Sequence, residues 1–134
     1  ALLPGWKTSA NGKDMEPGYR DEYLGRQHVV MTHPLDKDTG VTLSKCVDVP
    51  KDGAPKLEVI LANHGQGDFS FVARGDGREI LHKKIEGRPA WQTVSVDLAA
   101  FAGKTVAVEL VNQPDGWSWE AAYWGGIEIK KAGR

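Results

Sequence analysis

The sequence predicts an all-β protein, an antiparallel β-sandwich of about eight short strands. Apolar and polar residues alternate along most of the chain, as they do in strands that place one face on a core and the other in solvent. Clusters of Gly, Pro, Asn and Asp, which favour turns, separate these alternating segments. Helical periodicity is almost absent, so strands joined by loops account for most of the pattern.

The composition supports one globular domain spanning residues 1–134, which we expect to be a monomer. A hydrophobic content of 40% with five tryptophans is enough to form a core. The formal net charge of −1 creates no general attraction for nucleic acid or for an anionic membrane. No apolar run approaches the roughly 18 residues of a membrane span. We therefore expect neither nucleic acid nor membrane as a partner.

The first quarter of the chain lacks the alternation. Because it is rich in Gly and Pro, we expect residues 1–27 to form an irregular lead-in. The chain begins at Ala1 rather than Met, and we expect it to have been excised from a larger protein.

The first two expected strands cover residues 28–33 and 41–49. In the second, Lys45 interrupts an apolar phase that runs from Val41 to Val49. A β-bulge near Lys45 and Cys46 would explain the interruption, and so would a strand edge that passes from covered to open. Cys46 is the only cysteine, which excludes an internal disulfide, and we expect it to be a small buried residue.

Residues 69–74 and 78–85 form the clearest predicted hairpin. A two-residue type I′ turn at Asp76 and Gly77 would match the twist of the strands, since both residues accept a positive φ. A three-residue loop, 75–77, is the alternative and would shift the pairing by one residue. The two-residue turn predicts three cross-strand pairs: Arg74 with Glu79, Val72 with Leu81, and Phe71 with His82.

The remaining alternating segments follow Leu57, Val94 and Val106, and Ile127 with Ile129 closes the chain. One helical turn is expected at residues 98–102, with Asp97 as its N-cap and Gly103 ending it. The residues that we expect in the core are Val59, Leu61, Val94, Val96, Val106, Val108, Leu110 and Ile127. Trp91 and Trp124 lie in or beside strands, which favours core or edge cover for both.

Residues 91–110, WQTVSVDLAAFAGKTVAVEL, combine a strand ending in Asp-Leu, a turn with Phe-Ala-Gly-Lys, and a second strand. With the later Trp-rich loop and the closing IEI, this stretch resembles the galactose-binding-like β-sandwich (jelly-roll) domains, which include carbohydrate-binding modules and accessory domains of secreted multidomain bacterial proteins. The stretch NQPDGWSWEAAYW is also similar to accessory modules of such proteins. The resemblance implies a jelly roll and a secreted or periplasmic location. Members of this fold often bind a structural calcium, and the resemblance leaves such a site open, although no residue cluster here carries it over. Beyond that ion we expect no cofactor.

Two loops carry the residues best suited to a ligand. Residues 63–68 and 112–120 are dense in amides and carboxylates, which hydrogen-bond vicinal hydroxyls well. The second loop adds Trp117 and Trp119, whose indole faces can stack on the C–H face of a pyranose. If the strands before the two loops run in the same direction, both loops lie at one end of the sandwich.

These loops predict a non-catalytic carbohydrate-binding module that binds a neutral glycan. In this hypothesis Trp117 or Trp119 stacks on the sugar. The residues expected to hydrogen-bond it are Asn112, Gln113, Asp115 and Glu120, with His64 and Gln66 from the neighbouring loop.

The alternative function is a structural or docking module that packs against neighbouring domains of the parent protein or other protein partners, with the tryptophans as interface anchors. At the level of residues, Trp117 and Trp119 suit a core equally well. Turn formation alone would also explain four polar residues, Asn63, Asp68, Asn112 and Asp115.

Of the function classes considered, catalysis has the least support in the sequence. The sequence contains no HExxH, CxxC or GxSxG motif, so we expect neither a metal site nor an activated serine. His28 and His33 are five residues apart and face opposite sides of a strand. An acid pair such as Asp115 and Glu120 would need a deep cleft for glycosidase chemistry, which a sandwich of this size rarely offers.

Overall fold

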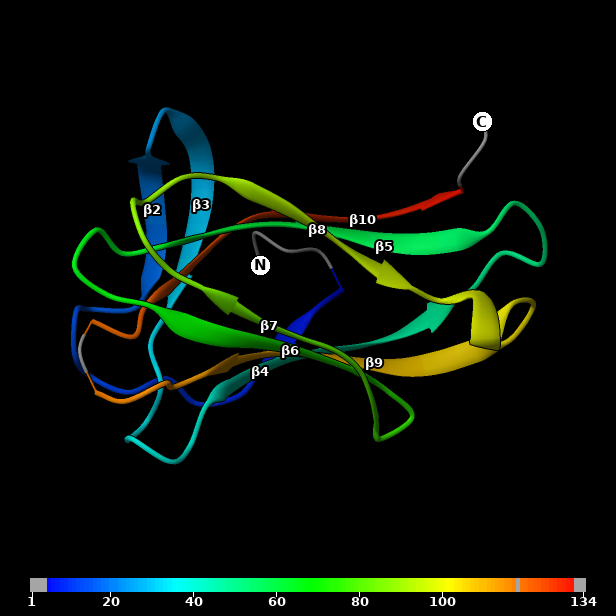
Figure 1. Cartoon of the computed structure of the whole chain (residues 1–134), viewed down its shortest axis with the longest axis horizontal. Coiled ribbons are helices and arrows are strands. Elements are labelled where there is room, and N and C mark those ends of the chain that lie inside the picture. Colours follow the sequence, from blue (N-terminus) through cyan, green and yellow to red (C-terminus); the bar gives the residue numbers. More distant parts are fainter. Residues whose placement is uncertain (1–4, 118, 132–134) are drawn as a thin grey trace.

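The computed structural model describes residues 5–117 and 119–131, which form two antiparallel five-stranded sheets packed face to face (Figure 1). The first sheet has the order β1 (Lys7–Thr8), β4 (Val41–Asp48), β9 (Thr105–Gln113), β6 (Phe69–Gly75), β7 (Arg78–Ile85). The second has the order β2 (Gly18–Tyr23), β3 (Arg26–Thr32), β10 (Ala122–Lys131), β5 (Pro55–Asn63), β8 (Gln92–Asp97). The predicted antiparallel jelly-roll sandwich is confirmed, with ten strands in the described residues in place of about eight.

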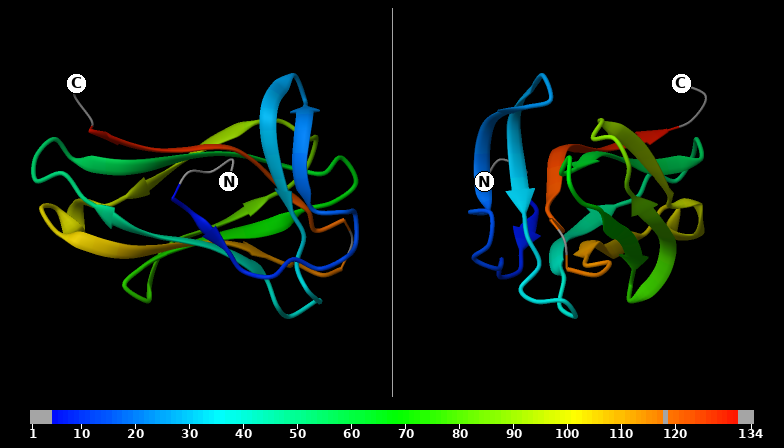
Figure 2. Two further views of the ribbon diagram at one scale, coloured as in Figure 1. Left: turned by 180° about the vertical axis from the view of Figure 1, so that it is seen from behind. Right: turned by 60° about the vertical axis from the view of Figure 1, so that its left-hand side comes forward.

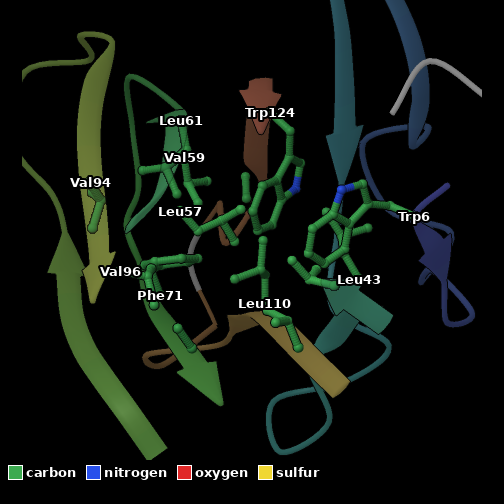
Figure 3. Close-up of a cluster of buried hydrophobic side chains, with 14 of the residues drawn as sticks. Trp6, Leu43, Leu57, Val59, Leu61, Phe71, Val94, Val96, Leu110 and Trp124 are labelled. Atoms are coloured by element: carbon green, nitrogen blue, oxygen red, sulfur yellow. The ribbon is translucent and has the colours of Figure 1, made fainter. Parts of the chain in front are cut away.

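The expectation of an irregular lead-in over residues 1–27 is wrong in part. Both β1 and β2 lie within it, β1 pairing with β4 and β2 with β3 in the hairpin that stands at one edge of the molecule (Figure 2). Trp6 packs into the core beside Leu43, with 8% of its surface exposed (Figure 3). These strands are short or mostly exposed, so they produce no apolar alternation in the sequence.

The core between the sheets contains the alternating residues, as predicted (Figure 3). Ile127 is only half-buried and packs at the margin, whereas Trp124 is fully buried, as expected. The predicted core residues that are buried are Val59, Leu61, Val94, Val96, Val106, Val108 and Leu110. Burial of these aliphatic side chains is the main favourable contribution to folding.

A smaller cluster lies on the other face of the second sheet. Tyr23 of β2 stacks on Tyr123 of β10, with ring centroids 3.6 Å apart, and burial raises the pKa of Tyr23 to about 12. Trp91 is half-buried, meets Tyr23 edge-on and donates its indole N–H to the Tyr23 carbonyl. Trp91 therefore covers the edge of this cluster, as its place beside a strand suggested.

Two expectations about β4 are wrong. The register with β9 is regular from Val41 to Asp48, so no bulge lies at Lys45 and Cys46. Lys45 is exposed although it shares the phase of buried neighbours, which agrees with the alternative of a strand edge that opens to solvent. Cys46 is exposed rather than buried, because it lies on the outer face of β4 opposite the exposed Ala107.

The β6–β7 hairpin has the predicted turn, with positive φ at Asp76 (49°) and Gly77 (81°) and Arg74 opposite Glu79. A register shift follows between Arg74 and Ala73. Beyond this bulge the predicted pairs are wrong by one residue: Val72 faces His82 and Phe71 faces Lys83. The residues of the turn determine the cross-strand pairing only as far as the first bulge in the hairpin.

The predicted helical turn is a shorter 3₁₀ turn, η1 (Ala99–Phe101), which connects β8 to β9. The Asp97 carboxylate accepts a hydrogen bond from the Ala99 N–H at 2.9 Å, although Leu98, fully buried, holds the N-cap position. Gly103 ends the turn with a φ of 76°.

Leu110→Ala tests the assigned face of β9. Leu110 is fully buried between Leu43 and Ala73 on the neighbouring strands, so the truncation should lower the free energy of unfolding by about 2–5 kcal/mol. Chemical denaturation measures the loss, with Ile129→Ala, at a residue 36% exposed, as the control of smaller effect. A loss below about 0.5 kcal/mol for Leu110→Ala would contradict the assigned face.

Candidate functional site

One end of the sandwich gathers five loops, residues 9–17, 33–40, 64–68, 86–91 and 114–121, which we call the loop end (Figures 1 and 2). Residue 118 lies outside the described residues. β5 and β9 both run toward this end, which is the condition under which the two loops singled out from the sequence lie together. The His64 ring stacks on Trp119, with centroids 4.7 Å apart and planes 13° apart.

A buried hydroxyl joins the two sheets beneath these loops. Thr32, at the end of β3, accepts hydrogen bonds at its Oγ1 from Asn112 Nδ2 and Trp124 Nε1, both at 3.0 Å. Asn112 belongs to the first sheet and the other two residues to the second, and all three are fully buried. The contact therefore fixes the start of residues 114–121 relative to the opposite sheet.

Asn63 fastens two further loops. Its side-chain amide is fully buried and donates to the carbonyls of His64, Gly67 and Gly87, at 3.0–3.3 Å. The amide thus closes residues 64–68 and attaches them to residues 86–91. This contact supports the interpretation of Asn63 as a turn residue.

Lys84 connects the two predicted ligand loops across the surface. Its Nζ lies 3.1 Å from Asp115 Oδ2 and 3.6 Å from Asp68 Oδ2, with Glu86 also in reach at 3.7 Å. Asp115 above all, together with Glu86 and Asp68, raises the pKa of Lys84 above its ordinary value. Exposed ion pairs of this kind contribute little to stability, but they hold both loops near one cation.

Trp117 and Trp119 are 44% and 45% exposed, so the structure places both on the surface rather than in the core. They line a hollow of about 300 Å³ together with Asp14, Met15 and His33. His33 meets Trp117 edge-on, with centroids 5.2 Å apart. The hollow offers two indole surfaces beside a carboxylate and an imidazole.

His33 has a defined hydrogen-bonding state in this hollow. Its Nδ1 lies 2.9 Å from the Pro34 carbonyl, which can only accept, so Nδ1 carries the proton. In the neutral ring Nε2 is therefore an acceptor. The side chain itself is largely buried, with 4% of the residue exposed.

Several predicted hydrogen-bonding residues belong to the scaffold instead. Asn112 (0% exposed) and Glu120 (1%) are buried and are not available to a ligand at the surface, which corrects their predicted role. The Asn112 side-chain amide donates to the Thr32 hydroxyl. The Glu120 carboxylate accepts a hydrogen bond from the Asp115 N–H, and this second contact closes the Trp-bearing loop. Gln113 is half-buried, and its Nε2 lies 3.5 Å from the Asp38 carbonyl that accepts its hydrogen bond.

The other predicted residues, Asp115 and Gln66, are not among the residues that line the hollow. Asp115 is exposed and paired with Lys84, and Gln66 is exposed next to His64. The Gln66 N–H donates to His64 Nδ1 at 3.1 Å, so a hydrogen bond within residues 64–68 also holds this loop in its conformation.

Sequence reasoning missed Asp14, Met15 and His33. Asp14 and Met15 lie in the segment expected to be irregular, where no periodicity marks a position. His33 was considered only as a metal ligand paired with His28, which lies on β3 and contacts Tyr19. Its place directly after a strand is the signal that could have identified it, because that same feature identified the two loops.

The residues present do not fit the structural calcium that the resemblance implies. No group of three His, Cys, Asp or Glu side chains within residues 5–117 and 119–131 is arranged to hold a metal ion. The loop-end carboxylates of Asp68 and Asp115 are paired with Lys84. Across the same described residues, none of the helices has the length and apolar character needed to span a bilayer.

No family model and no curated protein sequence matches this chain, but solved structures match it over nearly its whole length. One is the K1 cleaved adhesin domain of Lys-gingipain from Porphyromonas gingivalis W83, with a TM-score of 0.61 and 18% identity, covering 97% of this chain and 92% of that one. Another is TmCBM61 in complex with β-1,4-galactotriose, with a TM-score of 0.62 and 12% identity, covering 96% and 90%. A third is CBM35 from Paenibacillus barcinonensis, with a TM-score of 0.59 and 11% identity, covering 98% and 96%.

These adhesin and carbohydrate-binding domains are galactose-binding-like β-sandwiches. This chain has the same fold. The resemblance drawn from residues 91–110 is thereby confirmed for the architecture. A cyclase from Fischerella sp. also matches, with a TM-score of 0.62 and 12% identity, covering 98% of this chain and 85% of that one. The galactose-binding-like fold therefore does not by itself decide between binding and catalysis.

Thr32→Val tests the buried hydroxyl. The substitution keeps the shape but leaves the Trp124 indole N–H without its acceptor and Asn112 with only the Thr32 carbonyl at 3.3 Å, so the free energy of unfolding should fall by roughly 1–3 kcal/mol. Thr93→Val, on the exposed face of β8, is the matched control and should cost little. Equal denaturation midpoints for both variants would contradict the importance of this contact.

His64 should titrate below the ordinary histidine value of 6.5, because burial lowers its pKa. Because the folded protein then binds fewer protons than the unfolded chain, the stability that neutral His64 confers is complete above pH 6.5 and is lost as pH falls through the lower folded-state pKa. NMR titration of the imidazole measures the midpoint, and a value at or above 6.5 would contradict the burial of this ring against Trp119.

Proposed function

We propose that this chain is a non-catalytic carbohydrate-binding module that binds a neutral glycan at the loop end. The observation that carries the proposal is the hollow of about 300 Å³ whose lining includes Trp117 and Trp119, each nearly half exposed. Exposed indoles are costly to leave in water without a partner. Their flat apolar faces match the C–H face of a pyranose.

Polar groups around the indoles suit sugar hydroxyls. The Asp14 carboxylate accepts hydrogen bonds, and His33, whose neutral ring with Nδ1 donating to Pro34 has an acceptor at Nε2, belongs to the same lining. A sugar carries both an apolar face and a rim of hydroxyl donors, so stacking and hydrogen bonding act on one ring. The Trp-bearing loop keeps its predicted function in this proposal, with His33 and Asp14 in place of the buried Asn112 and Glu120.

Contacts around the hollow hold it in shape before a ligand arrives. His64 stacks on Trp119, His33 meets Trp117 edge-on, and Lys84 bridges the two loops through Asp68 and Asp115. Pre-ordered side chains lose less entropy on binding, which favours affinity for a small ligand.

The fold comparison supports a binding function. Among the matching domains, TmCBM61 holds β-1,4-galactotriose, and CBM35 is a carbohydrate-binding module. The acid pair considered for glycosidase chemistry supports no catalytic proposal, because Asp115 pairs with Lys84 and Glu120 is buried. A secreted or periplasmic location and a monomeric state remain predictions that accompany this proposal.

The docking alternative makes the opposite prediction for the isolated domain, which would then bind no sugar. A glycan array with residues 1–134 separates the two functions. Silence across all glycans would overturn the carbohydrate-binding proposal and favour docking.

Trp117→Ala and Trp119→Ala should each weaken glycan binding by about tenfold, because each removes an indole face from the hollow. Titration of the strongest array glycan into wild type and both variants measures the loss, from a wild-type affinity in the roughly millimolar to micromolar range. Tyr19→Ala, at an exposed aromatic residue of β2, is the control.

Thermal melts check that all three variants fold. Wild-type affinity in both tryptophan variants would place the glycan elsewhere on the molecule. Added salt should change the affinity little, because a neutral glycan releases no counterions.

A further inference from the structure

We infer that the glycan bound at the loop end is a disaccharide or a longer chain that lies across Trp117, with one sugar unit on each side of this residue. This inference rests on the proposed carbohydrate-binding function and deepens it from a neutral sugar to an extended chain. It starts from a second hollow beside the first.

The second hollow has about 320 Å³ and is lined by Leu35, Asp36, Lys37 and Trp117. The first is lined by Asp14, Met15, His33, Trp117 and Trp119. Trp117 belongs to both linings, so the two spaces adjoin at this residue. Each space lies near the lower limit of roughly 300 Å³ for small-molecule sites, so one compact ligand would leave the other space empty.

The second hollow has an ordered wall rather than a loose loop. The Leu35 N–H donates to the Thr39 carbonyl at 3.0 Å, and the Asp38 N–H donates to Asp36 Oδ1 at 2.9 Å. This tight turn keeps Leu35 on the surface with 46% of its area exposed, beside the similarly exposed Trp117. Gln113 Nε2 donates to the Asp38 carbonyl, which ties the turn to the last residue of β9, just before the loop with Trp117.

The two hollows offer different kinds of contact to a ligand that occupies both. The first combines indole faces with the acceptors of Asp14 and His33, which suits a unit held by its hydroxyls. The second combines Leu35 and Trp117 with the aliphatic stem of Lys37, which suits the C–H face of the next unit. Adjacent sugar units in a chain present both features, so a linked pair fills both spaces.

The first experiment compares ligand lengths. The strongest neutral glycan of the array is shortened to its mono-, di- and trisaccharide fragments, with galactose, β-1,4-galactobiose and β-1,4-galactotriose as a fixed reference series. The disaccharide should bind about tenfold more tightly than the monosaccharide, because the second unit adds contacts in the Leu35 hollow without a second cost of association.

The second experiment assigns the gain to a residue. Leu35→Ala should lower disaccharide affinity to the monosaccharide value and leave monosaccharide affinity unchanged, whereas Trp117→Ala should weaken both. Leu24→Ala, at a residue 42% exposed in the β2–β3 turn, is the matched control and should change neither. Leu35 is exposed, so the variant should keep the wild-type melting temperature.

The outcomes separate the two proposals. If no glycan binds at any length, the carbohydrate-binding function fails, and this inference fails with it. If sugars bind but mono- and disaccharides have equal affinity, or Leu35→Ala leaves the gain intact, the inference is wrong and the carbohydrate-binding function stands.

Discussion

The Thr32 hydroxyl is the polar contact on which the geometry of the loop end depends. It accepts two hydrogen bonds in a fully buried place, one from each sheet, through Asn112 and Trp124. Aliphatic packing holds two sheets together but permits small sliding, whereas a buried donor without its acceptor is strongly disfavoured. This one contact therefore fixes the sheets relative to each other where the ligand loops begin. Asn63 then extends the constraint to residues 64–68 and 86–91.

The strands that one can predict from the sequence are those with one face on the core. Val59 and Leu61, or Val106 and Val108, stand at every second position because β5 and β9 are interior strands that turn one face to the core. The residues between them, Ile60 and Ala107, are half-buried and exposed. β1 has no such pattern, since Lys7 and Thr8 are both exposed and pair at a sheet edge. The hairpin shows the same limit on a smaller scale. Asp and Gly specify the turn, but the bulge beside Arg74 has no residue signature, so the register beyond it was wrong.

The candidate site likewise has features that the sequence indicates and features that only the structure shows. Composition alone identifies the His64 loop and the Trp-bearing loop, whereas the shared direction of β5 and β9 that brings them together is visible only in the structure. The burial of Asn112 and Glu120 is not marked in the sequence either, because a polar residue is buried only where partners satisfy it, and the partner of Asn112 lies far along the chain. Thr32 is 80 residues from Asn112, and nothing local identifies it as that partner. Local composition therefore pointed to a loop that lines the hollow, but it assigned to a ligand some polar side chains that the structure uses in the scaffold.

The direction of β10 has a practical consequence. It starts at Ala122 beside the loop end and finishes at Lys131 at the opposite end of the sandwich (Figure 1). A surface, a bead or a fluorescent fusion attached beyond Lys131 would leave the loop end on the far side of the sandwich from the attachment. A chip coated with the domain in this manner would display the loop end toward the flowing solution.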